Sequence, residues 1–137
     1  MTDLQIAKEG LAGHTICLCK DGKLIFSDRR GISPMIDFIE SGTDLNGYSV
    51  ADLVVGKAAA FLFVKCKIKN VFAKTISESG KDVLEKNGIH FEYETLTEKI
   101  VNRAGTDICP MEKAVSNTEN AEETYELLKK QLELFQS

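Results

Sequence analysis

The sequence predicts an α/β fold, a three-layer α/β/α sandwich on a mixed sheet of about four or five strands. Two short alternating segments flank Asp21-Gly22, a strong signal for a two-residue hairpin turn. Further along the chain, strand-like segments are separated by helical ones, which favours crossover connections and helices that cover a sheet. The chain has 137 residues, 43% of them hydrophobic, which is typical of one globular domain spanning residues 1–137.

The first elements are a helix and the hairpin. Thr2 or Asp3 caps a helix that Gly10 or Gly13 can end. Residues 15–20 and 23–27 alternate as the two strands of the hairpin. The apolar face of the helix consists of Leu4, Ile6, Ala7 and Leu11.

Two further helices are expected before residue 65. Ser33 is the predicted N-cap of the first, with Pro34 as its first helical residue. Residues 49–64 predict a long buried helix around which the chain is organised, because they are apolar on nearly all sides. Within it, Gly56 permits the close approach of a strand or a ligand. Lys57 either extends to solvent or faces a pocket, where it meets an anionic ligand or a carboxylate.

The second half of the chain predicts two more strands and four more helical segments. The strands are residues 70–76 and 89–94, and the helical segments are residues 81–86, residues 97–104, a turn beginning at Pro110 and residues 120–135. Ser77 and Ser79 lie at the start of the first of these helices. The last is amphipathic, and its inner face consists of Leu127, Leu128, Leu132 and Phe135.

Composition argues against several classes of function. The net charge is −4 and the pI is about 5.2, so nucleic acid is not an expected partner. No apolar run is long enough to span a membrane and the N-terminus lacks a signal peptide, which predicts a cytoplasmic protein. The sequence contains no Cys-x-x-Cys, and His14 and His90 are isolated, so we expect neither a metal nor another cofactor.

The order of elements resembles the cytidine-deaminase fold. In that fold a helix and a hairpin precede one helix with a zinc ligand and the catalytic Glu, and a second helix with Pro-Cys-x-x-Cys. Two stretches, Asp52 with Val55-Gly56-Lys57-Ala58-Ala59 and Ile108-Cys109-Pro110-Met111-Glu112, more closely resemble an uncharacterised, mainly prokaryotic family with a deaminase-like fold and no zinc ligands. The resemblance implies the fold and brings no activity with it.

The positions of the zinc ligands are changed in this chain. The first ligand and the Glu become Val54 and Gly56 on this alignment. The paired cysteines become Ser77 with Gly80, or Glu78 with Lys81 in the neighbouring register. Zinc-dependent deamination needs three ligands and a proton-transferring Glu, so we do not expect it here.

Residues 109–112 offer a second candidate site. With Pro110 as the first helical residue, Cys109 is the N-cap and Glu112 the third helical residue. Cys109 is then a reactive thiol, or the turn supplies N–H donors to a ligand, or the segment is a structural helix start. A cysteine nucleophile normally needs a histidine base, and neither histidine has an evident route to Cys109.

Three functions follow from these patterns. The first is the binding of a nucleotide-like or other small anionic ligand in a cleft. The second is a metal-free enzyme with Cys109 as nucleophile and Glu112 or Lys57 in acid–base or electrostatic roles. The third is a non-catalytic homo-oligomeric module, built through the terminal helix or an exposed sheet edge. The expected ligand-binding residues are Asp52, Gly56, Lys57, Ser77, Ser79 and Pro110.

Overall fold

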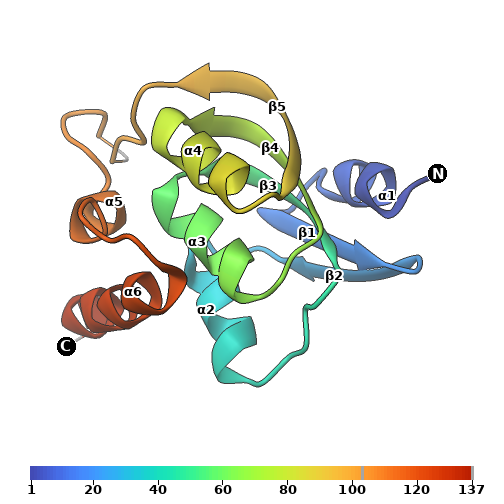
Figure 1. Cartoon of the computed structure of the whole chain (residues 1–137), viewed down its shortest axis with the longest axis horizontal. Coiled ribbons are helices and arrows are strands. Elements are labelled where there is room, and N and C mark those ends of the chain that lie inside the picture. Colours follow the sequence, from blue (N-terminus) through green and yellow to red (C-terminus); the bar gives the residue numbers. More distant parts are fainter. Residues whose placement is uncertain (103, 137) are drawn as a thin grey trace.

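The computed structural model describes residues 1–102 and 104–136, the last two by their backbone alone, and shows one mixed sheet with helices on both faces (Figure 1). The strands are β1 (Ile16–Lys20), β2 (Lys23–Ser27), β3 (Ser49–Val55), β4 (Asn70–Ser77) and β5 (His90–Thr97). The helices are α1 (Asp3–Gly10), α2 (Ser33–Glu40), α3 (Lys57–Lys65), α4 (Glu78–Lys86), α5 (Pro110–Ala114) and α6 (Ala121–Gln136). The predicted α/β sandwich is confirmed.

The strand order in the sheet is β2-β1-β3-β4-β5. Strand β1 is antiparallel to both β2 and β3, whereas β3, β4 and β5 are parallel. Helices α3 and α4 make the crossovers between the parallel strands, so their N-termini lie at the carboxyl ends of β3 and β4. This is the edge of the sheet where the candidate site forms.

Two apolar clusters lie on the two faces of the sheet. The main apolar cluster joins the strands to α2, α3, α4 and α6 and includes Val50, Leu62, Val71, Leu84 and Leu128. The second cluster joins α1 to the opposite face and consists of Leu4, Ala7, Leu11, Cys17, Cys19, Ala51 and Phe72. The predicted apolar face of the first helix is therefore confirmed, with Ile6 partly buried beside it.

The expected helix start and hairpin turn are both present. Thr2 caps α1 by accepting a hydrogen bond from the N–H of Gln5, and the Gln5 side chain accepts one from the N–H of Thr2. Asp21 and Gly22 have φ values of 51° and 79°. Two positive φ values are those of a type I′ turn, which suits the twist of the flanking strands.

The prediction of one long helix over residues 49–64 is wrong. Ser49–Val55 form the central strand β3, and the helix begins only at Lys57, with Gly56 as its N-cap. A parallel strand covered on both faces is apolar along its whole length, so its periodicity does not distinguish it from a buried helix. The β-branched residues Val50, Val54 and Val55 suit the strand.

Two other predictions need correction. Ile32, rather than Ser33, is the N-cap of α2, and its side chain makes no capping hydrogen bond; Pro34 is the second residue of the helix. Within residues 97–104, Thr97 ends β5, and Val101 forms an isolated bridge with Ile108 where a helix was expected. Arg103 lies outside the described residues. The predicted helix starts at Pro110 and after Asn120 are confirmed to within one residue.

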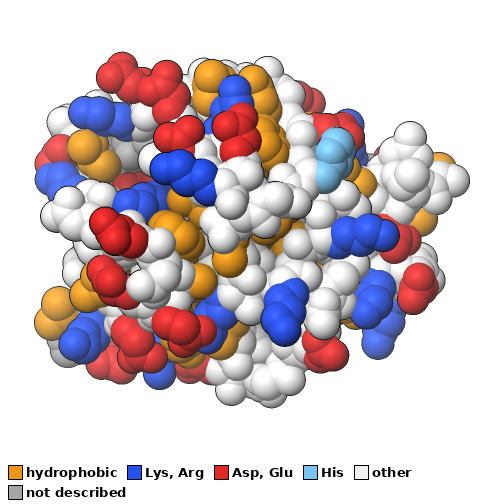
Figure 2. Space-filling view, viewed as in Figure 1, with side chains coloured by type: hydrophobic (Ala, Val, Ile, Leu, Met, Phe, Trp, Pro, Cys, Tyr) orange, Lys and Arg blue, Asp and Glu red, His pale blue; other side chains and the backbone are white. Residues whose placement is uncertain are grey.

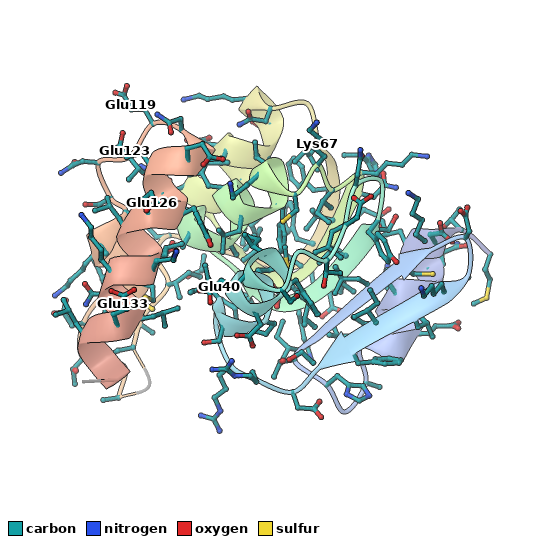
Figure 3. All side chains as sticks on the ribbon, turned by 90° about the horizontal axis from the view of Figure 1, so that it is seen from below. Glu40, Lys67, Glu119, Glu123, Glu126 and Glu133 are labelled. Carbon is teal, nitrogen blue, oxygen red and sulfur yellow. The ribbon has the colours of Figure 1, made fainter. Side chains whose placement is uncertain are left out.

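Helix α6 packs its apolar side on α3. Leu128 is fully buried, and Leu127 and Leu132 are partly buried against the main apolar cluster. The exposed glutamates labelled in Figure 3, Glu123, Glu126 and Glu133, lie on the side of α6 that faces away from the sheet. The Phe135 side chain lies outside the described residues. Among the helices described, none has the length and apolar character needed to cross a bilayer.

Candidate functional site

Two glycines bring the N-termini of α3 and α4 together. A Cβ atom on Gly80 would lie 2.8 Å from the carbonyl oxygen of Val55, which is closer than real Cβ contacts. A Cβ atom on Gly56 would lie 2.1 Å from a carboxylate oxygen of Glu112. Only glycine therefore fits at either position without movement of its neighbours. The sequence predicted the close approach of a strand or a ligand at Gly56, and the group that approaches it is instead the Glu112 side chain of α5.

Glu112 caps helix α3 from a distant part of the chain. Its two carboxylate oxygens accept hydrogen bonds from the N–H groups of Lys57, at 2.8 Å, and Ala58, at 2.9 Å. These are among the first N–H groups of the helix, which have no partner within it, and the helix dipole favours a negative charge there. Glu112 therefore acts as the N-cap side chain that Gly56 lacks.

The electrostatics of Glu112 reflect two opposed effects. Burial raises the pKa of this carboxyl group, because the charged form loses hydration. The N–H groups of Ala58 and Lys57 and the ammonium group of Lys57 act in the opposite direction and lower the pKa. The Lys57 ammonium donates a hydrogen bond to the carbonyl oxygen of Ser116, at 2.9 Å. Lys57 therefore binds α5 through its backbone N–H and the segment that follows α5 through its side chain.

A cleft of about 500 Å³ lies between α3, α4 and the segment joining α5 to α6. Its apolar wall comes from Phe61 and Val83, and two cationic side chains, Lys57 and Lys86, line it. The remaining lining residues include Ser79, Asp82, Asn87, Thr118 and Glu119. Sites for small ligands have this size and this combination of an apolar wall with a few polar groups.

A second cleft, of about 370 Å³, adjoins the first at Lys57. It shares Lys57, Ser79 and Asp82 with the first cleft and also contains Glu112. Its additional charged residues are Glu78, Glu98 and Lys99, so carboxylates outnumber lysines in it. In Figure 2, cationic and anionic side chains are intermingled over the part of this face where α4, α5 and α6 lie in Figure 1.

The structure brings together some of the predicted site residues. Lys57, Ser79 and Glu112 lie in the clefts, and Gly56 contacts Glu112. Ser77 is the N-cap of α4: its hydroxyl accepts a hydrogen bond from the N–H of Gly80 and lies 3.2 Å from the hydroxyl of Ser79. The buried hydroxyl of Ser77 is therefore within hydrogen-bond distance of Ser79, which lines the clefts.

Cys109 and Pro110 start helix α5 and lie outside the two clefts. Cys109 is the N-cap as predicted, and its N–H donates to the carbonyl oxygen of Ile100. Pro110 is exposed and is the first residue of a helix only five residues long. Neither residue lines the clefts beside Lys57.

Asp52 is separate from this site. It pairs with Ile16 on β1 and with Ala73 on β4, and since both belong to the main apolar cluster, Asp52 shares their face of the sheet. The residue is 7% exposed. Burial raises the pKa of its carboxyl group to about 8, although the N–H groups of Leu53 and Val54 partly oppose this. Asp52 does not line either cleft.

Several cleft residues were missed from the sequence. Asp82 and Lys86 follow Ser79 at spacings of three and seven, so all three lie on one face of α4, and this helical spacing could have identified them. No sequence signal indicated Ser116 or Glu119, because their position depends on how the segment after α5 folds over α3. The described residues contain no group of three or more side chains arranged to hold a metal ion.

Comparisons with known proteins identify relatives without a known function. A family model described as TM1506, a domain of unknown function (DUF1893), matches residues 6–132. The crystal structure of a DUF1893 family protein (TM1506) from Thermotoga maritima is similar, with a TM-score of 0.82 and 24% sequence identity over 89% of this chain and 83% of that chain. At this identity the similarity concerns the fold alone. No curated protein gives a significant match.

Proposed function

The chain belongs to the DUF1893 family, a family of unknown function, and on that premise we propose that it binds a nucleotide-like or other small anionic molecule in the cleft beside Lys57. The observation that carries this proposal is the meeting of Lys57, Ser79 and Lys86 around an apolar wall. The two ammonium groups suit a phosphate or carboxylate, and Phe61 and Val83 suit the uncharged part of the ligand.

The choice between the two clefts follows from charge. In the first cleft Lys57 and Lys86 are matched by Asp82 and Glu119, and the two lysines reach it from different helices. The second cleft has a carboxylate excess that would repel an anion. Glu112 already occupies the N–H donors at the start of α3, so the anionic group of the ligand meets side-chain ammonium groups.

Lys57 can bind an anionic ligand while it keeps its hydrogen bond to Ser116. An ammonium group has three N–H donors, and the carbonyl oxygen of Ser116 accepts one of them. The remaining donors are available to an anion in the cleft. The helix starts of α3 and α4 lie side by side at the carboxyl ends of β3 and β4, and this arrangement supports a ligand site at this edge of the sheet.

Thermal unfolding in the presence of nucleosides, nucleotides and sugar phosphates, each with and without zinc, tests the proposal. A ligand at 100 times its dissociation constant adds about 2.7 kcal/mol to the free energy of unfolding, which raises the midpoint by several degrees. We expect a phosphorylated compound to give this shift without zinc, and its dephosphorylated counterpart to give less. No shift with any compound would contradict the proposal, and a shift that requires zinc would contradict our alignment of the metal positions.

Two lysine variants test whether the ligand binds in the cleft beside Lys57. Lys57→Ala should remove the ligand-dependent shift, because it removes a cation from the cleft. Lys69→Ala is the matched control: Lys69 directly precedes β4, at the opposite end of the parallel strands, and should leave the shift unchanged. Equal shifts in both variants would place the ligand elsewhere.

A further inference from the structure

Strand β2 forms one edge of the sheet and carries two exposed apolar side chains. Leu24 and Phe26 are 38% and 42% exposed, although both are large apolar side chains. They point to the face that carries α1, where the Phe26 ring packs 4.5 Å from that of His14. In Figure 3 the β1–β2 hairpin projects from the side of the molecule away from α6.

The same two residues present the free backbone groups of this edge. In an antiparallel ladder, every second residue directs its N–H and C=O groups to the neighbouring strand. The two-residue turn makes Lys20 and Lys23 a hydrogen-bonded pair, and the alternation then also turns Ile25 and Ser27 toward β1. The N–H and C=O groups of Leu24 and Phe26 therefore point away from the sheet.

We propose that β2 pairs with β2 of a second copy of this chain, antiparallel and about a two-fold axis at Ile25, to form one continuous ten-stranded sheet. In this register Leu24 lies opposite Phe26 of the second copy, and each pair exchanges two backbone hydrogen bonds. The four exposed apolar side chains then form one strip across the junction. An isologous contact of this kind is closed, so assembly stops at the dimer.

The charges along the edge favour a second copy as the occupant. In the register centred on Ile25, the only charge within the strand, Lys23, lies opposite the uncharged Ser27. No pair of like charges opposes this association within the strand.

The other edge of the sheet does not have this property. Strand β5 carries Glu92 and Glu94 near its centre. Antiparallel pairing of two copies about Tyr93 would place Glu92 opposite Glu94, and pairing about either glutamate would place it opposite itself. Like charges in directly opposite positions are destabilising, and charged residues at a sheet edge commonly prevent such pairing. The inference is therefore specific to β2.

Analytical ultracentrifugation of the full chain, from about 10 µM to about 1 mM, tests the proposal over the range of weak to moderate association. The expected species has twice the monomer mass of 15.1 kDa. Leu24→Lys should shift the protein to the monomer, because it introduces a charge into the apolar strip at an already exposed position. Tyr93→Lys, the matched control on β5, should leave the dimer unchanged.

A charge-pair variant tests the register. In the double variant Leu24→Lys with Phe26→Glu, the introduced cation of one copy lies opposite the introduced anion of the other, so the dimer should return. Registers centred on residue 24 or 26 would instead oppose like charges. Far-UV circular dichroism checks that each variant is folded. A monomeric wild-type chain at about 1 mM would overturn the proposal, as would a folded double variant that stays monomeric or a dimer lost only in Tyr93→Lys.

Discussion

Replacing Gly56 by Ala should destabilise the protein by displacing the Glu112 carboxylate. The added Cβ atom would lie 2.1 Å from Oε1 and 2.5 Å from Cδ of Glu112, so the side chain must leave its position. The backbone of Gly56, with φ of −102° and ψ of −170°, is accessible to alanine, so strain is not the cause of the loss. The effect therefore reports on the cap.

The size of the effect follows from the two hydrogen bonds. A bond to a charged group contributes about 1.5–3 kcal/mol, and burial of the carboxylate offsets part of the sum. We expect Gly56→Ala and Glu112→Ala each to lower the free energy of unfolding by about 2–3 kcal/mol. At an unfolding entropy of about 2.1 cal/mol/K per residue, this corresponds to a fall in melting temperature of about 7–10 °C.

The double variant provides the decisive measurement. The three atoms nearest to the added Cβ all belong to Glu112. Once Glu112→Ala has removed them, Gly56→Ala should cost less than about 0.5 kcal/mol more. Urea unfolding of the wild type, both single variants and the double variant gives the coupling energy. Additive losses in the double variant would refute the reasoning, and Glu126→Ala, an exposed site on α6, controls for the loss of a surface carboxylate.

Two further predictions concern titratable groups. Burial raises the pKa of Asp52 to about 8 from 3.8, so the folded chain binds a proton that the unfolded chain has lost, and stability should fall as pH rises from about 4 to about 8. By pH 7 the free energy of unfolding should have fallen by about 4 kcal/mol through this group. Asp52→Asn should abolish this part of the decline, as measured by urea unfolding at each pH. Parallel pH profiles of the wild type and the variant would contradict the prediction. Among the cysteines, Cys109 should react first with iodoacetamide, because Cys17 and Cys19 are buried and burial raises the pKa of Cys66 to about 11. Mass spectrometry of the alkylated peptides gives the order, and earlier labelling of Cys66 would show the prediction to be wrong.

The sequence predicted the elements whose signals are local. The Asp21-Gly22 turn, the capping of α1 by Thr2 and the start of α5 at Pro110 each depend on a few adjacent residues. Strand β3 was mistaken for a helix because its burial on both faces depends on β1, β4 and the covering helices. That information is not contained in the segment itself.

The candidate site divides in the same way. Gly56, Lys57 and Glu112 were identified as unusual residues, but their contact joins segments that no local pattern relates. Asp52 was grouped with them because a helix would have placed it one turn before Gly56. On strand β3 Asp52 instead lies between Ile16 and Ala73 of the neighbouring strands, and it lines neither cleft.

The cap on α3 also sets an order of events during folding. The bonds from Glu112 join residues 55 and 54 positions apart, and β4, α4 and β5 all lie within the loop that they close. Closing a loop of this length carries a large entropic cost before any contact forms. A nascent chain that lacks residue 112 already contains all five strands, yet the first N–H groups of α3 have no carboxylate to bind. Completion of this central helix is therefore a late step, which requires the segment that contains Glu112.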